Sequence, residues 1–156
     1  MDKLEAEAEC NIQAPPEIVW AFVSDVTRYP KWGPWRSAKY TTYKGEGNSS
    51  QRGPGAVQWL QSSKRYFFRH PISIEKILEV EDNRFLAYTV IGGSIPVRNY
   101  RAKITVTPMD DQTHLRWSAT WDATYRGRFV WKSLYKLYPQ LVKAVAIQAE
   151  RDAKNL

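Results

Sequence analysis

In two stretches of the second half of the chain, apolar or aromatic side chains alternate with polar ones. In residues 100–106 every second side chain is apolar or aromatic, from Tyr100 to Val106, and residues 115–123 show the same alternation. A period of two is typical of a strand with one face in a core and the other in solvent. Residues 108–112 between them predict a tight turn. We therefore expect an antiparallel hairpin, which requires further strands or helices to cover its apolar face.

The segments before this hairpin predict more strands. Residues 4–12 alternate in the same way, and further strands are expected at residues 39–44, 56–61, 72–80 and 85–91. Within residues 72–80 the apolar parity slips between Ile74 and Ile77, which predicts a β-bulge.

Two segments have helical rather than strand periodicity. Residues 16–24 begin at a proline and place apolar side chains on one helical face, which predicts a short helix. Residues 129–154 contain no glycine and repeat apolar side chains every three or four positions, which predicts a long C-terminal helix. Pro139 is expected to kink that helix or to mark its effective start. Leu134, Leu137, Leu141 and Val145 are expected to face the inner side of the last two strands.

This order of elements indicates an α+β fold. We expect residues 1–156 to form one domain, because no linker, repeat or low-complexity tract divides the chain. If the antiparallel sheet curls around the final helix, a pocket remains between the two. The chain has seven Trp and nine Tyr that could line such a pocket.

Three of the tryptophans gather in residues 19–35, a segment broken by prolines. Trp20 lies within the expected short helix, where core packing is the preferred interpretation. Trp32 and Trp35 are expected on an irregular connection, where they either cover one end of the sheet or contact a ligand at the mouth of the pocket.

Charge and cysteine content limit the classes of function. The net charge is +7, and residues 26–74 hold nine Lys or Arg and one acid, Glu46. A solvated basic face is the preferred explanation, and nucleic-acid binding ranks third because no RNP, KH or helix-turn-helix pattern is present.

Cys10 is the only cysteine, so an internal disulfide is excluded, and no apolar run reaches the length of a membrane span. We expect a cytoplasmic protein, monomeric or homodimeric, without an integral membrane segment.

Three stretches resemble a known family. They are IQAPPEIVWAFVSDVTRYPKWGPW, VIGGSIPVRNYRAKITVTP and THLRWSATWD, which are similar to the polyketide cyclase/dehydrase branch of the START-like, Bet v 1-like superfamily (SRPBCC). The likeness weakens in residues 41–69 and in the last helix. It implies the helix-grip fold, a seven-stranded antiparallel sheet wrapped around the C-terminal helix over a hydrophobic cavity. Members include lipid carriers, hormone receptors, aromatase/cyclases and dehydratases, so the resemblance is specific for the fold and not for the activity.

The leading hypothesis is therefore the binding, or transport, of a small hydrophobic, lipid-like or aromatic ligand in that cavity without conversion. The alternative is a cofactor-independent polyketide cyclase/aromatase or dehydratase, and the third is an interaction module for nucleic acid or protein. Large side chains expected near the cavity are the candidate ligand contacts: Trp32, Trp35, Val57, Trp59, Tyr88, Tyr100, Trp117, Trp121, Trp131, Leu134, Tyr135 and Tyr138.

Glu75 and Arg98 are the catalytic candidates if the protein is an enzyme. A bulge after Ile74 would turn Glu75 inward, and Arg98 shares the parity of Tyr100. The inward pair would form a polar anchor or a carboxyl group with a shifted pKa, but the preferred interpretation is that both side chains reach solvent at strand ends. Tyr88 and Tyr100 are further candidates for proton handling. No metal site and no cofactor are expected, because the two histidines and one cysteine lack ligand spacing.

Overall fold

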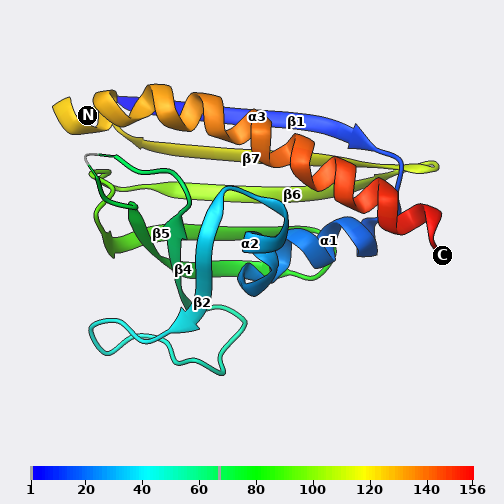
Figure 1. Ribbon diagram of the computed structural model, residues 1–156, viewed down its shortest axis with the longest axis horizontal. Coiled ribbons are helices and arrows are strands. Elements are labelled where there is room, and N and C mark those ends of the chain that lie inside the picture. Colours follow the sequence, from blue (N-terminus) through cyan, green and yellow to red (C-terminus); the bar gives the residue numbers. More distant parts are fainter. Residues whose placement is uncertain (1, 67) are drawn as a thin grey trace.

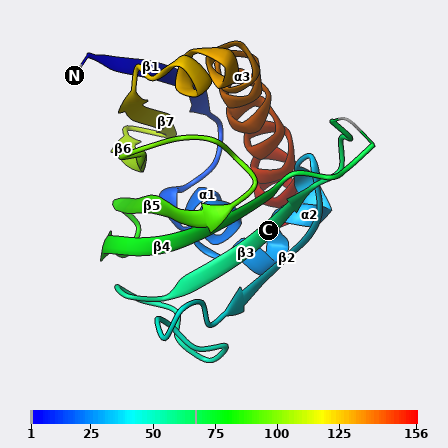
Figure 2. The ribbon, with the colours of Figure 1, turned by 90° about the vertical axis from the view of Figure 1, so that its left-hand side faces the viewer.

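A seven-stranded antiparallel sheet curves around one long helix, as the computed structural model shows for residues 2–66 and 68–156 (Figure 1). The elements in chain order are β1 (Lys3–Ile12), α1 (Pro16–Ser24), the 3-10 helix η1 (Val26–Arg28), α2 (Tyr29–Trp32), β2 (Trp35–Thr41), β3 (Val57–Ser62), β4 (Ile72–Glu81), β5 (Phe85–Gly93), β6 (Arg101–Met109), β7 (Gln112–Asp122) and α3 (Tyr125–Lys154). The strand order is β1-β7-β6-β5-β4-β3-β2. Figure 2 shows α3 lying in the curve of the sheet, with α1 and α2 closing one end. The expected α+β helix-grip fold is confirmed.

The expected hairpin is β6 and β7, and its inward positions pair as the alternation predicts. Ala102 lies opposite Ala119, and Ile104 lies opposite Trp117.

The predicted bulge between Ile74 and Ile77 of β4 is wrong, because β4 pairs with β3 without a shift over these positions. The register of β4 against β5 does shift between Ile74 and Glu75, but the extra residue there, Ile91, lies on β5. Ser73, Glu75 and Ile77 therefore share the inner face of β4 through the ordinary strand period.

Two boundaries differ from the sequence prediction. Trp32 ends α2 and Trp35 begins β2, so neither lies on an irregular connection and the strand starts four residues before the expected Lys39. The long helix starts at Tyr125, earlier than expected, because the side chain of Thr124 accepts a hydrogen bond from the backbone N–H of Gly127 and caps it. The helix then continues through Pro139, which does not mark its start.

The core lies between the inner face of the sheet and α3. Leu141 and Val145 of the helix are buried in one cluster with Ile104 and Trp117 of the sheet, as expected from their spacing. Burial of each such side chain contributes about 1.5–3 kcal/mol, so this contact fixes the helix across the sheet.

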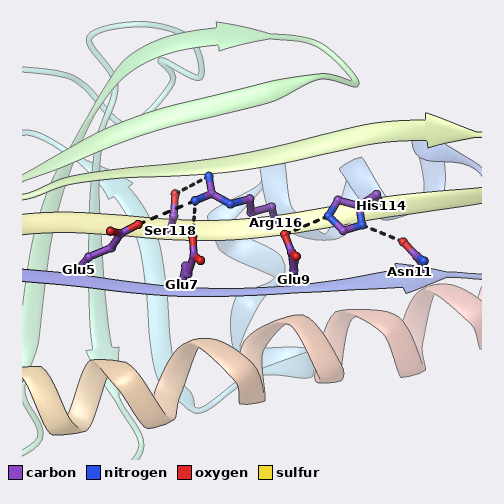
Figure 3. Close-up of polar contacts among 7 residues, drawn as sticks. All are labelled: Glu5, Glu7, Glu9, Asn11, His114, Arg116 and Ser118. Atoms are coloured by element: carbon purple, nitrogen blue, oxygen red, sulfur yellow. Dashed lines mark hydrogen bonds and ion pairs between the residues drawn. The ribbon is translucent and has the colours of Figure 1, made fainter.

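The outer face of β1 and β7 carries a row of paired polar side chains (Figure 3). The guanidinium group of Arg116 contacts the carboxylates of Glu5 and Glu7, and Nδ1 of His114 lies 2.8 Å from Oδ1 of Asn11. His114 therefore points away from the core. Exposed cross-strand pairs of this kind contribute little stability, but they favour one register of the two strands.

None of the described helices has the combination of length and hydropathy that is required to cross a membrane.

Candidate functional site

A pocket of about 620 Å³ lies between the sheet and the first half of α3. Its lining comes from the start of β2, the end of β3, the β3–β4 connection, the start of β4, the β5–β6 connection and one side of α3. The apolar residues that line it are Pro34, Trp35, Leu60, Pro71, Ile95, Pro96, Phe129, Val130, Leu134 and Leu137. We call this the outer pocket.

A smaller space of about 80 Å³ adjoins the outer pocket, and we call it the inner pocket. The two share a set of lining residues, which are Trp35, Leu60, Ser73, Ile95, Leu134 and Leu137. The inner pocket is lined in addition by Glu75, by the aromatic side chains of Tyr29, Tyr88, Tyr100, Trp117 and Tyr138, and by Val90, Val97 and Leu141. The site is therefore one mainly apolar depression whose inner end holds a carboxyl group and several tyrosine side chains.

Among the described residues, Glu75 is the only acidic side chain that lines the inner pocket. Its Oε1 accepts a hydrogen bond from Nε2 of Gln58 at 2.8 Å, and its Oε2 accepts one from Oγ of Ser73 at 2.9 Å. Burial raises the pKa of Glu75 to about 7, and the two hydrogen bonds partly oppose that rise. The carboxyl group thus changes its protonation near neutral pH.

Three tyrosine side chains, those of Tyr88, Tyr100 and Tyr138, line the same inner pocket as this carboxyl group. Tyr100 and Tyr138 are hydrogen-bonded through their hydroxyls, and Nε1 of Trp117 donates to the hydroxyl of Tyr88 at 3.1 Å. Burial, as the largest cause, raises the pKa of Tyr88 and Tyr100 well above the ordinary tyrosine value, and that of Tyr138 also rises. These hydroxyls remain protonated at neutral pH and keep their capacity to donate hydrogen bonds.

Trp35 stands where the outer and inner pockets meet. Its ring centroid lies 4.8 Å from that of Tyr29 and 5.4 Å from that of Trp32. Trp32 lines neither pocket. Its Nε1 donates a hydrogen bond to the carbonyl oxygen of Phe22 at 3.3 Å. Of the two indoles, Trp35 is the one that lines the pockets.

The structure brings together about half of the candidate ligand contacts predicted from the sequence. Those that line one or both pockets are Trp35, Tyr88, Tyr100, Trp117, Leu134 and Tyr138. The others, Trp32, Val57, Trp59, Trp121, Trp131 and Tyr135, line neither.

Val57 and Trp59 require a correction, because β3 has the opposite parity from the one assumed. Gln58 reaches Glu75 and Leu60 lines both pockets, so these two residues form the inner face of the strand. Trp59 consequently points outward, where Nζ of Lys39 lies 5.2 Å from its ring centroid.

Trp121, Trp131 and Tyr135 line neither pocket and make contacts within the fold instead. Nε1 of Trp121 donates to the carbonyl oxygen of Gly127 at 3.0 Å, and Nε1 of Trp131 donates to that of Glu5, also at 3.0 Å. Tyr135 packs on Trp131 with a centroid distance of 5.0 Å and is 57% exposed. Trp121 and Trp131 thus attach the first half of α3 to β7 and β1.

Arg98 does not meet Glu75. It lies in the β5–β6 connection and is exposed, because β6 begins only at Arg101. Asn99 has a positive φ of 53°, which breaks the alternation that linked Arg98 to Tyr100. The inward pair of Glu75 and Arg98 is therefore wrong. The preferred interpretation, that both side chains reach solvent, is confirmed for Arg98 and wrong for Glu75, which lines the inner pocket.

The sequence interpretation missed the polar partners of Glu75 and the outer part of the pocket. Ser73 lies two residues before Glu75, so its position on the same face followed from the strand period. Gln58 was missed because β3 was expected to present Val57 and Trp59, rather than Gln58 and Leu60, on its inner face. The side chains of Phe129, Lys132 and Lys136 line the outer pocket at three- and four-residue spacing along α3, a pattern that the helix period contained.

Comparison with known proteins identifies the family. Residues 3–151 match the family described as "Polyketide cyclase / dehydrase and lipid transport". The chain is also 28% identical over 123 residues to MLP-like protein 423 of Arabidopsis thaliana, which covers 74% of each protein.

Solved structures share the fold at lower identity. The aromatase/cyclase ZhuI of Streptomyces sp. R1128 superposes with a TM-score of 0.74 at 16% identity, covering 96% of this chain and 95% of ZhuI. A START superfamily protein of Mycobacterium smegmatis gives a TM-score of 0.73 at 16% identity, covering 94% and 97%. XoxI of Bacillus cereus gives 0.72 at 21% identity, covering 93% and 94%. The chain belongs to the polyketide cyclase/dehydrase family of the SRPBCC superfamily, whose proteins bind hydrophobic ligands and include cyclases.

Proposed function

We propose that this protein binds a small, largely apolar molecule with one polar end, and that it does so without converting it. The observation that carries this proposal is that the two pockets adjoin. A mainly apolar outer pocket of about 620 Å³ shares lining residues with an inner pocket that is lined by Glu75 and by Tyr88, Tyr100 and Tyr138.

The two parts of the site supply different contributions to binding. Burial of an apolar body against Leu134, Leu137 and Trp35 supplies most of the free energy, at about 25 cal/mol per Å² removed from water. The inner polar groups fix the orientation. A hydroxyl group on the ligand fits them best, because it donates to the carboxylate of Glu75 and accepts from a tyrosine hydroxyl.

An enzyme of the cyclase or dehydratase type is the second candidate, and one observation favours it. The pKa of Glu75 is raised to about 7, which is the range in which a buried carboxyl group transfers protons efficiently. Arg98 is not available to assist, so in this alternative Glu75 acts with Tyr88 or Tyr100. Nucleic-acid binding is disfavoured, since Arg52 covers the ring of Tyr40 at 3.9 Å and Lys39 covers that of Trp59.

A pair of matched ligands tests the proposal. Naphthalene and 2-naphthol differ only in one hydroxyl group, so the ratio of their affinities reports the polar inner end. We expect wild-type protein to bind both and to prefer 2-naphthol, and we expect Glu75→Leu to reduce that preference about tenfold, the effect of one hydrogen bond to a charged group. Glu79→Leu, an exposed change on the same strand, is the control.

The outcomes separate the candidates. Absence of saturable binding for both compounds contradicts the pocket proposal, and an unchanged preference in Glu75→Leu contradicts the role of Glu75. Incubation with a linear poly-β-ketone, followed by chromatography, identifies an enzyme if a cyclised or dehydrated product forms at a rate that Glu75→Leu abolishes.

A further inference from the structure

Two separate segments border the outer pocket and carry its most exposed side chains. One is the β3–β4 connection, at residues 63–66 and 68–71, and the other is the start of α3, at residues 125–136. Lys64 and Tyr66 of the first segment and Phe129, Lys132 and Lys136 of the second line the same pocket. We call these two segments together the mouth surface.

The exposed aromatic side chains are concentrated on the mouth surface. Eight large apolar side chains among the described residues are exposed, and the three outside this surface, Met109, Ile147 and Leu156, are not aromatic. The five on it are Tyr66, Phe68, Tyr125, Phe129 and Tyr135, and Phe68 is 96% and Tyr125 92% exposed. Rings so fully in water bury apolar area only when a partner covers them.

The same surface carries unbalanced positive charge. It holds no acidic residue and seven lysine or arginine residues, which are Lys64, Arg65, Arg69, Arg126, Arg128, Lys132 and Lys136. Among the described residues, no carboxylate lies within ion-pair distance of any of the seven. The row on β1 and β7 is the contrast, since there Arg116 is matched by Glu5 and Glu7 (Figure 3).

We propose that the mouth surface docks the protein onto a lipid bilayer that contains anionic headgroups. Tyrosine and phenylalanine rings enter the boundary between headgroups and acyl chains, while lysine and arginine bind the anionic headgroups. The rings project from two separate elements on either side of the pocket, so the partner must adapt its shape to both, which a fluid lipid surface does. Docking presents the pocket to the bilayer, and a ligand then passes between them without crossing water. This last step rests on the proposed function, whereas docking does not.

Vesicle flotation tests the docking with variants that do not touch the pocket. Phosphatidylcholine vesicles are compared with vesicles containing roughly one third phosphatidylglycerol. Arg69→Ala/Arg128→Ala removes one cation from each segment, and Phe68→Ala/Tyr125→Ala removes one ring from each. Arg84→Ala/Lys154→Ala removes two exposed cations elsewhere, and Met109→Ala/Ile147→Ala removes two exposed apolar side chains elsewhere, so these two variants are the controls.

We expect binding to the anionic vesicles only, weakened by salt, and about tenfold weaker in each mouth-surface variant but within about twofold of wild type in each control. All four variants are expected to keep the wild-type affinity for 2-naphthol, which separates this proposal from the pocket proposal. Absence of vesicle binding at low salt overturns it, as does an equal loss in the Arg84/Lys154 control, which indicates attraction by net charge alone. Binding to a single-stranded oligonucleotide or a poly-glutamate peptide, with none to vesicles, overturns it in favour of a polymeric anion.

Discussion

Nε2 of Gln58 on β3 lies 2.8 Å from Oε1 of Glu75 on β4, inside the curve of the sheet. The two residues are direct neighbours in the ladder between these strands. The bond holds an ionisable carboxyl group at the inner end of a mainly apolar depression. The stability of the fold therefore depends on the charge of this group.

Replacing Glu75 by Gln should remove a pH dependence of folding. The pKa of Glu75 is raised from 4.5 to about 7 by burial, so the folded state favours the neutral form. Below pH 4.5 both states are protonated and no penalty exists; as the pH rises from 4.5 to about 7, only the unfolded state ionises and stability is lost. The full loss is at most about 3 kcal/mol above pH 7.

Urea denaturation between pH 4 and pH 8 measures this effect. Wild type should lose stability across that interval and Glu75→Gln should be flatter by about 2–3 kcal/mol in total. Glu79→Gln, an exposed change on the same strand, should leave the wild-type curve unchanged. Parallel curves for wild type and Glu75→Gln would show that the carboxyl group is not desolvated.

Tyr138→Phe should destabilise the protein by about 1–2 kcal/mol, because it leaves the buried hydroxyl of Tyr100 without its partner. Tyr100→Phe should cost a similar amount, and the double variant less than the sum of the two, since no orphaned hydroxyl remains. Tyr135→Phe on the same helix is exposed and should have no measurable effect. Additive costs in this cycle, measured by chemical denaturation, would mean that the two hydroxyls do not interact.

Gly93→Ala should destabilise the fold by at least about 2 kcal/mol. Gly93 has a φ of +101°, and a Cβ there would lie 2.2 Å from the backbone oxygen of Ile72, which cannot move without breaking the β4–β5 ladder. Gly53→Ala is the control, because its Cβ would meet nothing within 4 Å. Thermal unfolding compares the two, and equal melting temperatures would contradict the geometry of this strand end.

Most of the fold could be predicted from the sequence, because buried side chains recur every two residues in a strand and every three or four residues in a helix. The alternation around Ile104 and Trp117 located a hairpin that the structure contains. The helix spacing of Leu141 and Val145 likewise indicated the face that packs on the sheet. The slipped parity after Ile74 did not locate a bulge in β4, because the extra residue at that point lies on β5.

The site was less accessible from the sequence, because it depends on where strands begin and on which face each presents. In β3 a short apolar run fits either parity, so Trp59 was assigned inward although Gln58 and Leu60 occupy that face. Asn99, in a positive-φ conformation, interrupts the alternation that placed Arg98 inward. The outer pocket arises only when the β3–β4 connection and α3 come together, which no local pattern encodes.

The central claim is that an apolar ligand occupies the depression beside Trp35, and a probe titration on two tryptophan variants tests it most directly. Trp35 lines both pockets, whereas Trp20 on α1 is 8% exposed and lines neither. With the uncharged probe N-phenyl-1-naphthylamine, we expect saturable binding near one to one that is insensitive to salt. Trp35→Ala should weaken it by about 1–3 kcal/mol at little cost in stability.

Trp20→Ala should do the reverse, destabilising the fold by about 3–5 kcal/mol while the folded fraction keeps the wild-type affinity. If Trp35→Ala instead unfolds the protein and its remaining folded fraction binds the probe as tightly as wild type, then Trp35 belongs to the core and the pocket beside it is not the binding site.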